Sequence, residues 1–476
     1  MILPRLSPRT LIWLYAAAVA ALLGYFMFDI PVQLSDSFLN ILTVQRRSMT
    51  DIVIGNLWNA GYLRPLLFAP IKLVFALSGG DYHAWFRGVH VAQMALTVGL
   101  FVALLRVRNW TEAAAAPLAI AGCVTLHTFA GTIREAFPVN GYLTIVDGCL
   151  LVALICSSRP RWWSSPVAIV ALVVSALTAE SGLLVWVVIV AAFAAGWRGV
   201  GRGGLVAATA CVAAYFVARF FVFHVGTPSM IERSTGFGLQ VLDPPQIIAR
   251  FGAHPLPFYA YNVVASMASV LFAEPRGGVF WVVRGVLARD VEPWTIVNLV
   301  ACTTLTALIA RHILRRRDRW LRWDLEDGDR LTLVFLAVLV ANATMGYVYT
   351  KDVIMSPAGV FFALAGYISV CELADQVPAL PRRAALVASM CLAVCAGSWG
   401  IKAVGIHYSL REGARDVRNQ WSYVDDWLVK QEIVLNEPRE RAVRDALRAD
   451  ALWRLPARPR IVIHWPWPGN WFDNSQ

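Results

Sequence analysis

The sequence predicts an all-α polytopic membrane protein with about eleven transmembrane helices. Hydrophobic residues make up 58% of the 476 residues, and charged residues only 15%, whereas a soluble domain carries about 25% charged residues. The apolar residues also come in long blocks, and a spanning helix needs about 20 of them because its backbone polar groups must be satisfied within the helix. Arginines recur between alternate blocks, which is typical of a chain that crosses a membrane repeatedly.

The expected helices follow these apolar blocks in order along the chain. They lie near 11–28, 85–105, 113–131, 140–156, 166–178, 182–196, 204–224, 293–313, 331–348, 353–373 and 384–403. Arg5 and Arg9 precede the first block as in a signal peptide, but the block is long and no small-x-small cleavage site follows it. We therefore interpret it as an uncleaved first helix. The two short helices around Glu180 are also consistent with one bent pair.

The distribution of arginine predicts the orientation of the chain. With a cytoplasmic N-terminus, every inner connection carries at least two arginines. These connections hold Arg5 and Arg9, Arg106 and Arg108, Arg159 and Arg161, Arg198 and Arg202, the 311–330 loop, and Arg382 and Arg383. The short outer connections near 132–139, 179–181 and 349–352 carry one basic residue or none. This bias explains the formal charge of +11 without nucleic acid, for which no soluble basic domain is visible.

Two longer outer segments are expected to hold juxtamembrane helices. Segment 29–84 contains an amphipathic stretch, 66–77, that is too short to span and is predicted to lie in the membrane interface. Segment 225–292 contains the apolar stretch 258–272. A span there would invert every later loop and place the arginines of the 311–330 loop outside, so we expect an interfacial or re-entrant helix.

The sequence divides into a transmembrane domain, 1–403, and an extracytoplasmic helical tail, 404–476. The tail has helical periodicity to about residue 450 and ends in an aromatic stretch from Trp465 to Trp471. We expect these aromatics to anchor at the membrane interface, with a ligand platform as the alternative. No internal repeat is visible.

The eight cysteines predict neither a disulfide framework nor a zinc site. All of them fall inside apolar segments, without a polar loop partner. Cys391 and Cys395 share a helix face but have no His or acidic ligand nearby, so we interpret them as packing residues.

Ionisable residues from five separate segments are predicted to meet at the outer face. They are Asp36, Arg64, Lys72, Asp81, His83, Arg87, His90, Arg134, Glu135, Glu180, Lys351 and Asp352. Charged groups at membrane depth are costly, so those kept there are candidates for function. For any single residue, a helix cap or an interfacial anchor is the alternative interpretation.

The order of these features resembles a known class of enzymes. Asp36 follows the first helix, the stretch Gly61–Leu66 contains Tyr62, Arg64 and Pro65, and His83 and His90 begin the second helix. Leu126-His127, Thr178–Ser181 and Tyr349–Asp352 follow in order, with Pro357 downstream. Over roughly residues 10–375, this resembles GT-C membrane glycosyltransferases, in the branch related to protein O-mannosyltransferases.

The resemblance implies a GT-C-like fold and sugar transfer from a polyprenyl-phosphate carrier to an acceptor hydroxyl at the extracytoplasmic face. It implies Asp36 as general base, since the family places its catalytic acid there. We expect Arg64 and Lys351, with Arg134 behind them, to hold the donor phosphate. Tyr62, His83, His90, Glu180 and Asp352 are expected to line the substrate pocket. The alternatives are loop solvation for Asp36, snorkelling for Arg64 and a salt bridge to Asp352 for Lys351.

Three positions depart from the family pattern. Phe86 replaces an asparagine, Thr128 a proline and Ala179 a lysine, and no tetratricopeptide repeat follows. The acceptor, whether glycan, lipid or protein, and the exact donor therefore stay open. We expect no cofactor and no metal, because Asp36 is a single acid rather than an Asp-x-Asp pair.

Two other classes of function remain. A polytopic transporter or flippase should show inverted repeats and charges near the midplane, and a non-catalytic subunit of an envelope polysaccharide assembly system would tolerate the departures. The Arg- and Ala-rich composition suggests a GC-rich bacterium, hence an inner-membrane protein with a cytoplasmic N-terminus and a periplasmic tail. Asp36→Asn separates these classes, because only an enzyme should lose activity while folding normally.

Overall fold

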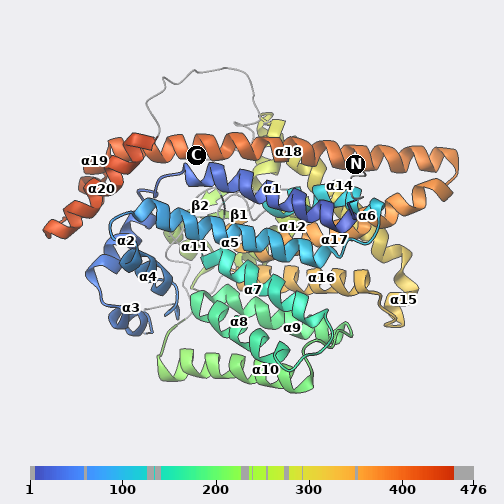
Figure 1. Cartoon of the computed structure of the whole chain (residues 1–476), viewed down its shortest axis with the longest axis horizontal. Coiled ribbons are helices and arrows are strands. Elements are labelled where there is room, and N and C mark those ends of the chain that lie inside the picture. Colours follow the sequence, from blue (N-terminus) through green and yellow to red (C-terminus); the bar gives the residue numbers. More distant parts are fainter. Residues whose placement is uncertain are drawn as a thin grey trace, which may run out of the picture.

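The computed structural model describes residues 6–57, 62–125, 133, 141–226, 235–237, 240–253, 256–272, 278–291, 293–348 and 352–454. Nearly all of its regular structure is α-helical (Figure 1). The exception is a short antiparallel pair, β1 (Thr235–Phe237) and β2 (Gln240–Leu242). The all-α prediction is confirmed at this level.

Seven helices in the described chain are long and apolar enough to cross a membrane. They are α1 (Pro8–Phe28), α5 (Tyr82–Leu105), α10 (Arg202–Val217) with its π-helical continuation η3 (Ala218–Val222), α14 (Pro293–Arg315), α16 (Asp327–Met345), α17 (Ser356–Gln376) and α18 (Arg382–Ser422). Shorter apolar helices are α7 (Gly141–Cys156), α8 (Ser164–Thr178), α9 (Leu184–Ala194) with the 3-10 turn η2 (Glu180–Leu183) before it, and α12 (Leu256–Phe272).

All eleven apolar blocks expected to be helical contain a helix, with α6 (Trp110–Thr125) at the block 113–131. The number of spans stays a prediction. Within the described chain α6 and α7 have 16 residues, α8 has 15 and α9 has 11, fewer than the about 20 that a straight span needs. Helix α12, predicted to be interfacial, has 17, so length alone does not separate it from these four.

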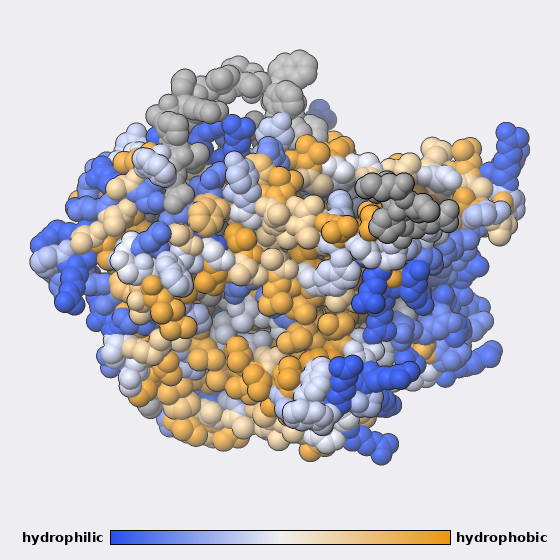
Figure 2. Space-filling view, viewed as in Figure 1, coloured by the Kyte–Doolittle hydropathy of each residue, from blue (hydrophilic) through white to orange (hydrophobic). Residues whose placement is uncertain are grey.

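Helix α17 forms the centre of the bundle and packs against α6, α14 and α16. Of the most apolar stretch of α17, 89% is buried inside the protein, whereas the corresponding stretches of α10 and α18 are only 22% buried. Close contact depends on small residues, because a Cβ on Gly366 would lie 2.5 Å from Leu305 and one on Gly122 would lie 2.2 Å from Trp399. Helices α10 and α18, at the periphery of the bundle (Figure 1), expose apolar side chains instead. Seen from the same side, Figure 2 shows hydrophobic residues across the middle of the molecule and hydrophilic residues toward both ends.

The arginine-bearing connections gather at one end of the bundle, which we call the arginine-rich end. Arg106 bonds Asp327 at 3.0 Å and the carbonyl of Ser157 at 2.5 Å, and the indole of Trp197 donates to Asp327 at 3.1 Å. The predicted inner loops are therefore neighbours in space. Whether this end faces the cytoplasm remains a prediction.

The first long segment and the tail pack together at the other end. The segment contains α2 (Asp36–Arg46), α3 (Met49–Gly55) and α4 (Ala69–Leu77), so a helix does occupy the predicted amphipathic stretch. Helix α18 runs through the expected domain boundary at 403 and continues to Ser422, followed by α19 (Val424–Lys430) and α20 (Pro438–Arg454). The aromatic end of the tail lies outside the described residues.

The remaining short elements connect these helices. They are α11 (Pro244–Phe251), α13 (Gly278–Ala288), α15 (Arg317–Leu321), η5 (Asp352–Met355) and η6 (Val377–Ala379).

Candidate functional site

The break between α8 and α9 positions Glu180. Helix α8 ends at Thr178, Ala179 is extended (φ −159°, ψ 157°), and η2 then begins at Glu180. The turn packs so closely that a Cβ on Gly182 would lie 2.0 Å from the backbone of Ser175. The glycine therefore lets η2 fold back against α8.

Arg64 reaches Glu180 from the segment that precedes α4. The backbone N–H of Leu66 donates to the carbonyl of Leu177 at 3.0 Å, which fixes this segment against the end of α8. The Arg64 guanidinium then donates to Glu180 through Nε at 2.7 Å and lies 2.5 Å from the same oxygen through Nη2. The guanidinium also lies over the ring of Tyr62, 4.1 Å from its centroid, in a cation–π contact.

Arg219 approaches the same carboxylate from the opposite side. It sits in the π-helical turn η3, a type of irregularity that is frequent at functional sites. Its buried guanidinium donates to Glu180 Oε1 at 3.0 Å, to the hydroxyl of Tyr215 at 3.1 Å and to the carbonyl of Gly226 at 2.8 Å. Both oxygens of Glu180 thus accept from arginines 116 and 39 residues away in the chain.

These residues line a cavity of about 480 Å³ that we call the Glu180 cavity. Its walls are mainly apolar and aromatic, and come from η2, α9, α10, η3 and the end of α16. The lining residues are Tyr62, Arg64, Tyr142, Ala179, Glu180, Ser181, Leu183, Trp186, Val187, Val212, Tyr215, Phe216, Arg219, Phe220, Ala341, Thr344, Met345, Gly346, Tyr347, Val348 and Ile354.

The Glu180 cavity has an excess of positive charge among the lining residues that the structure describes. Two guanidinium groups face one carboxylate there. Burial acts to lower the pKa of Arg64, but the adjacent Glu180 outweighs it and the pKa is raised above its ordinary value. Arg64 therefore stays charged. Guanidinium donors in a partly desolvated pocket are suited to a phosphate or carboxylate ligand.

The structure brings three of the predicted site residues together, Tyr62, Arg64 and Glu180. Lys351 and Arg134 lie outside the described residues, as does the side chain of Asp352. However, Val348 and Ile354, on the two sides of Lys351 in the chain, both line the cavity. The described residues before and after this segment therefore reach the cavity.

Asp36, His83 and His90 are not among the residues that line the Glu180 cavity. Asp36 is exposed in the first turn of α2, and no hydrogen bond or ion pair joins it to a described residue. His83 and His90 are buried on α5. His83 lies 2.6 Å from the carbonyl of Phe28 through Nε2 and 3.1 Å from Asp450 through Nδ1, so it contacts α1 and α20 rather than the cavity.

Several buried polar residues were not predicted from the sequence. Arg219 falls inside the expected helix 204–224, and a basic residue at membrane depth was the signal that could have identified it. Asp147, which contacts the Thr97 hydroxyl at 2.5 Å, and the buried Lys402 likewise lie within predicted helices. The predicted site residues, in contrast, lie between the predicted helices or near their ends.

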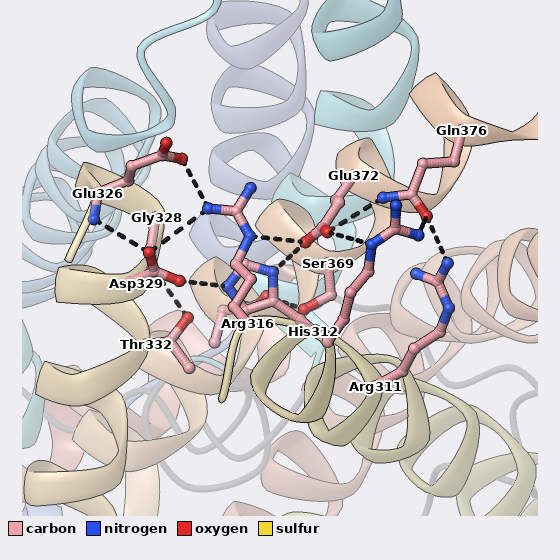
Figure 3. Close-up of polar contacts among 12 residues, drawn as sticks. Arg311, His312, Arg316, Glu326, Gly328, Asp329, Thr332, Ser369, Glu372 and Gln376 are labelled. Atoms are coloured by element: carbon pink, nitrogen blue, oxygen red, sulfur yellow. Dashed lines mark hydrogen bonds and ion pairs between the residues drawn. The ribbon is translucent and has the colours of Figure 1, made fainter. Parts of the chain in front are cut away.

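A larger cavity of about 880 Å³ opens at the arginine-rich end. Beside it, His312 on α14 lies between Asp329, at 3.2 Å, and Glu372 (Figure 3). Arg316 bonds Glu326 at 2.6 Å and lies 3.4 Å from Asp329. These charges satisfy one another, so the cluster joins the ends of α14, α16 and α17, whereas two arginines face one glutamate among the described residues of the Glu180 cavity.

Among the described residues no group of three or more His, Cys, Asp or Glu side chains could hold a metal ion, and no disulfide joins the eight cysteines. The absence of a cofactor stays an expectation.

Comparison of the chain with protein-family models, curated proteins and solved structures found no match.

Proposed function

We propose that this protein is a GT-C-type membrane glycosyltransferase that holds the phosphate of a polyprenyl-phosphate sugar in the Glu180 cavity. The observation that carries the proposal is the pairing of two arginines with one glutamate at an apolar cavity. Two of the three residues, Arg64 and Glu180, were expected from the resemblance to that class, and Val348 and Ile354 line the same cavity.

The charges suit the departure of a lipid phosphate. Transfer forms a bond from the acceptor oxygen to the anomeric carbon and breaks the bond from that carbon to the phosphate oxygen, which leaves with the electron pair. Fixed cations stabilise the charge that develops on the phosphate. Glu180 accepts hydrogen bonds from both guanidinium groups and so places the positive charges of Arg64 and Arg219 beside the cavity, where they can stabilise a phosphate.

The walls of the cavity suit the prenyl chain. Phe216 and Phe220, stacked at an interplanar angle of 4°, line the cavity and are also partly exposed on the outside of α10. Phe221 and Val222 continue this exposed apolar surface. A lipid chain could therefore lie on apolar surface on both sides of this wall.

The proposal keeps Asp36 as the general base that takes the proton of the acceptor hydroxyl. Both Glu180 oxygens already accept hydrogen bonds, so Glu180 is poorly placed for that role. Because Asp36 is exposed and does not line the cavity, base catalysis requires α2 to approach it when donor and acceptor bind.

The test separates phosphate binding from transfer. Arg64→Gln and Arg219→Gln should each weaken binding of polyprenyl phosphate by about 10- to 100-fold, since a hydrogen bond to a charged group is worth about 1.5–3 kcal/mol. Asp36→Asn should abolish sugar transfer and leave phosphate binding unchanged. Arg439→Gln, an exposed arginine on α20, is the matched control. Unchanged phosphate binding in both cavity variants would disprove the proposal.

Because Asp36 does not line the Glu180 cavity, a protein that binds lipid phosphate without transferring a sugar is the alternative. Such a protein would be a flippase or a non-catalytic subunit. In that case Arg64→Gln would impair function in cells, whereas Asp36→Asn would leave it intact.

A further inference from the structure

The segment that we call the loop Leu314–Trp323 comprises the end of α14, the short helix α15 and the two residues after it. It exposes large apolar side chains at the arginine-rich end. Leu314 is 68% exposed, Leu321 83% and Trp323 56%. Single exposed apolar residues are common on protein surfaces. Leu314 lies within the candidate span α14, but Leu321 and Trp323 lie beyond its end, so their exposure needs a further explanation.

The loop is held rigidly in this position. Trp323 has a left-handed backbone (φ 58°), uncommon for a residue other than glycine, and its indole donates to the carbonyl of Ala194 at 2.9 Å. Trp320 donates to the buried Asp329 at 3.1 Å. Asp329 belongs to the cluster with His312 and Arg316 (Figure 3). The exposure of Leu321 and Trp323 is therefore built into the fold.

Two arginines on the same loop point their charge outward. Arg317 is 74% exposed in its side chain and has one partner, the equally exposed Asp318 at 3.5 Å. Arg322 is exposed, and its side chain bonds no other described residue. In contrast, Arg316 and Arg319 are paired with Glu326. Exposed pairs such as Arg317–Asp318 are weak, so both outward arginines are available to a ligand.

Other loops at the arginine-rich end repeat this combination. Trp162, 89% exposed, follows Arg161, and the exposed Trp110 lies two residues after Arg108. Arg106 connects these loops to the 311–330 loop through Ser157 and Asp327. Tryptophan beside arginine at the ends of apolar helices is typical of contact with lipid headgroups.

We propose that the loop Leu314–Trp323 is a binding surface for anionic phospholipids. Arg317 and Arg322 would contact the headgroup phosphate, while Leu321 and Trp323 would enter the boundary between headgroups and acyl chains. Charge complementarity favours an anionic lipid over a zwitterionic one. The ends of candidate spans favour a lipid over a soluble protein, because headgroups surround such positions.

The experiment uses the full-length protein in nanodiscs of phosphatidylcholine with and without phosphatidylglycerol, and native mass spectrometry counts the retained lipids. The wild type should retain phosphatidylglycerol preferentially. The double variant Arg317→Gln/Arg322→Gln should lose about 30-fold in apparent affinity, from the usual effect of two basic residues at an anionic surface. Lys430→Gln/Arg439→Gln, two exposed charges in the tail, is the control and should behave as wild type.

Equal retention of the two lipids by the wild type would overturn the proposal, as would equal affinity of the wild type and the loop double variant. Full competition by millimolar inorganic phosphate would also overturn it, because it would indicate a free-phosphate site. A loop variant that loses only a soluble protein partner would also contradict it. None of these results bears on the Glu180 cavity, so this proposal and the proposed function fail independently.

Discussion

At the scale of residues, Glu180 controls two cations. Arg64 precedes Glu180 in the chain and Arg219 follows it, and each donates at least one hydrogen bond to the Glu180 carboxylate. Removing one partner of a buried ion pair is costly because it leaves uncompensated charge, whereas exposed pairs contribute little. The unequal environments of ion pairs in this chain make that difference measurable.

We predict that Glu180→Gln lowers the free energy of unfolding by roughly 3 kcal/mol, because two guanidinium groups lose their counter-charge. The control is Asp318→Asn, which breaks the exposed pair with Arg317 (3.5 Å) and should cost less than about 1 kcal/mol. Thermal unfolding of the purified variants in one detergent measures both. Similar losses in the two variants would show that Glu180 has no special structural weight.

At the scale of elements, the α8–η2–α9 break creates the site. A continuous helix through residues 164–194 would bury Glu180 on a helix face, whereas the extended Ala179 turns η2 toward Arg64. The absence of a side chain at Gly182 makes that return possible. The short lengths of α8 and α9 are therefore connected with the site.

Gly182→Ala should destabilise the protein by about 1–3 kcal/mol, the usual cost of forcing atoms into a packed site. It should also weaken binding of polyprenyl phosphate, because a displaced Glu180 no longer positions Arg64 and Arg219. Gly397→Ala on α18, where a Cβ would meet nothing within 4 Å, serves as the control and should be neutral or slightly stabilising. Melting temperature and phosphate affinity are measured together. A Gly182→Ala protein with wild-type values for both would refute the role of the close contact.

At the scale of the whole molecule, the tail closes over the start of the chain. The indole of Trp421 donates to the carbonyl of Val32 at 2.7 Å, Arg46 pairs with Glu440, and His83 lies 3.1 Å from Asp450. Val443, Leu447 and Ala451 bury the inner face of α20. The described part of the tail, up to Arg454, therefore packs against the start of the chain.

The docking of α20 should depend on pH. The hydrogen bond from Arg46 holds the pKa of Glu440 below its ordinary value. A lowered pKa means that the stabilisation is fully present above the ordinary value, about 4.3, and is lost as the pH falls through the lowered one. The protection of α20 amides, measured as the exchange rate relative to the intrinsic rate at each pH, should thus fall below about pH 4 in the wild type. Glu440→Gln should exchange faster at neutral pH and respond less to acid, and identical profiles would contradict this account.

The sequence predicted the helices well and the site in part. The apolar blocks at 11–28 and 353–373 became α1 and α17 because backbone hydrogen bonding in an apolar environment leaves few alternatives to a helix. The order of motifs led to Tyr62, Arg64 and Glu180. Arg219 was missed because it lies inside an apolar block, and Asp36 did not reach the cavity in this structure.

By itself, the sequence determined which segments are helical and which connections carry arginine, since both depend on local composition. Only the tertiary structure decided that Arg219 meets Glu180, that α18 continues past residue 403 and that α20 packs against α5. The physical reason lies in how such helices pack. Their surfaces are apolar nearly all round, so periodicity does not identify the contact face, and small residues and buried polar pairs select it.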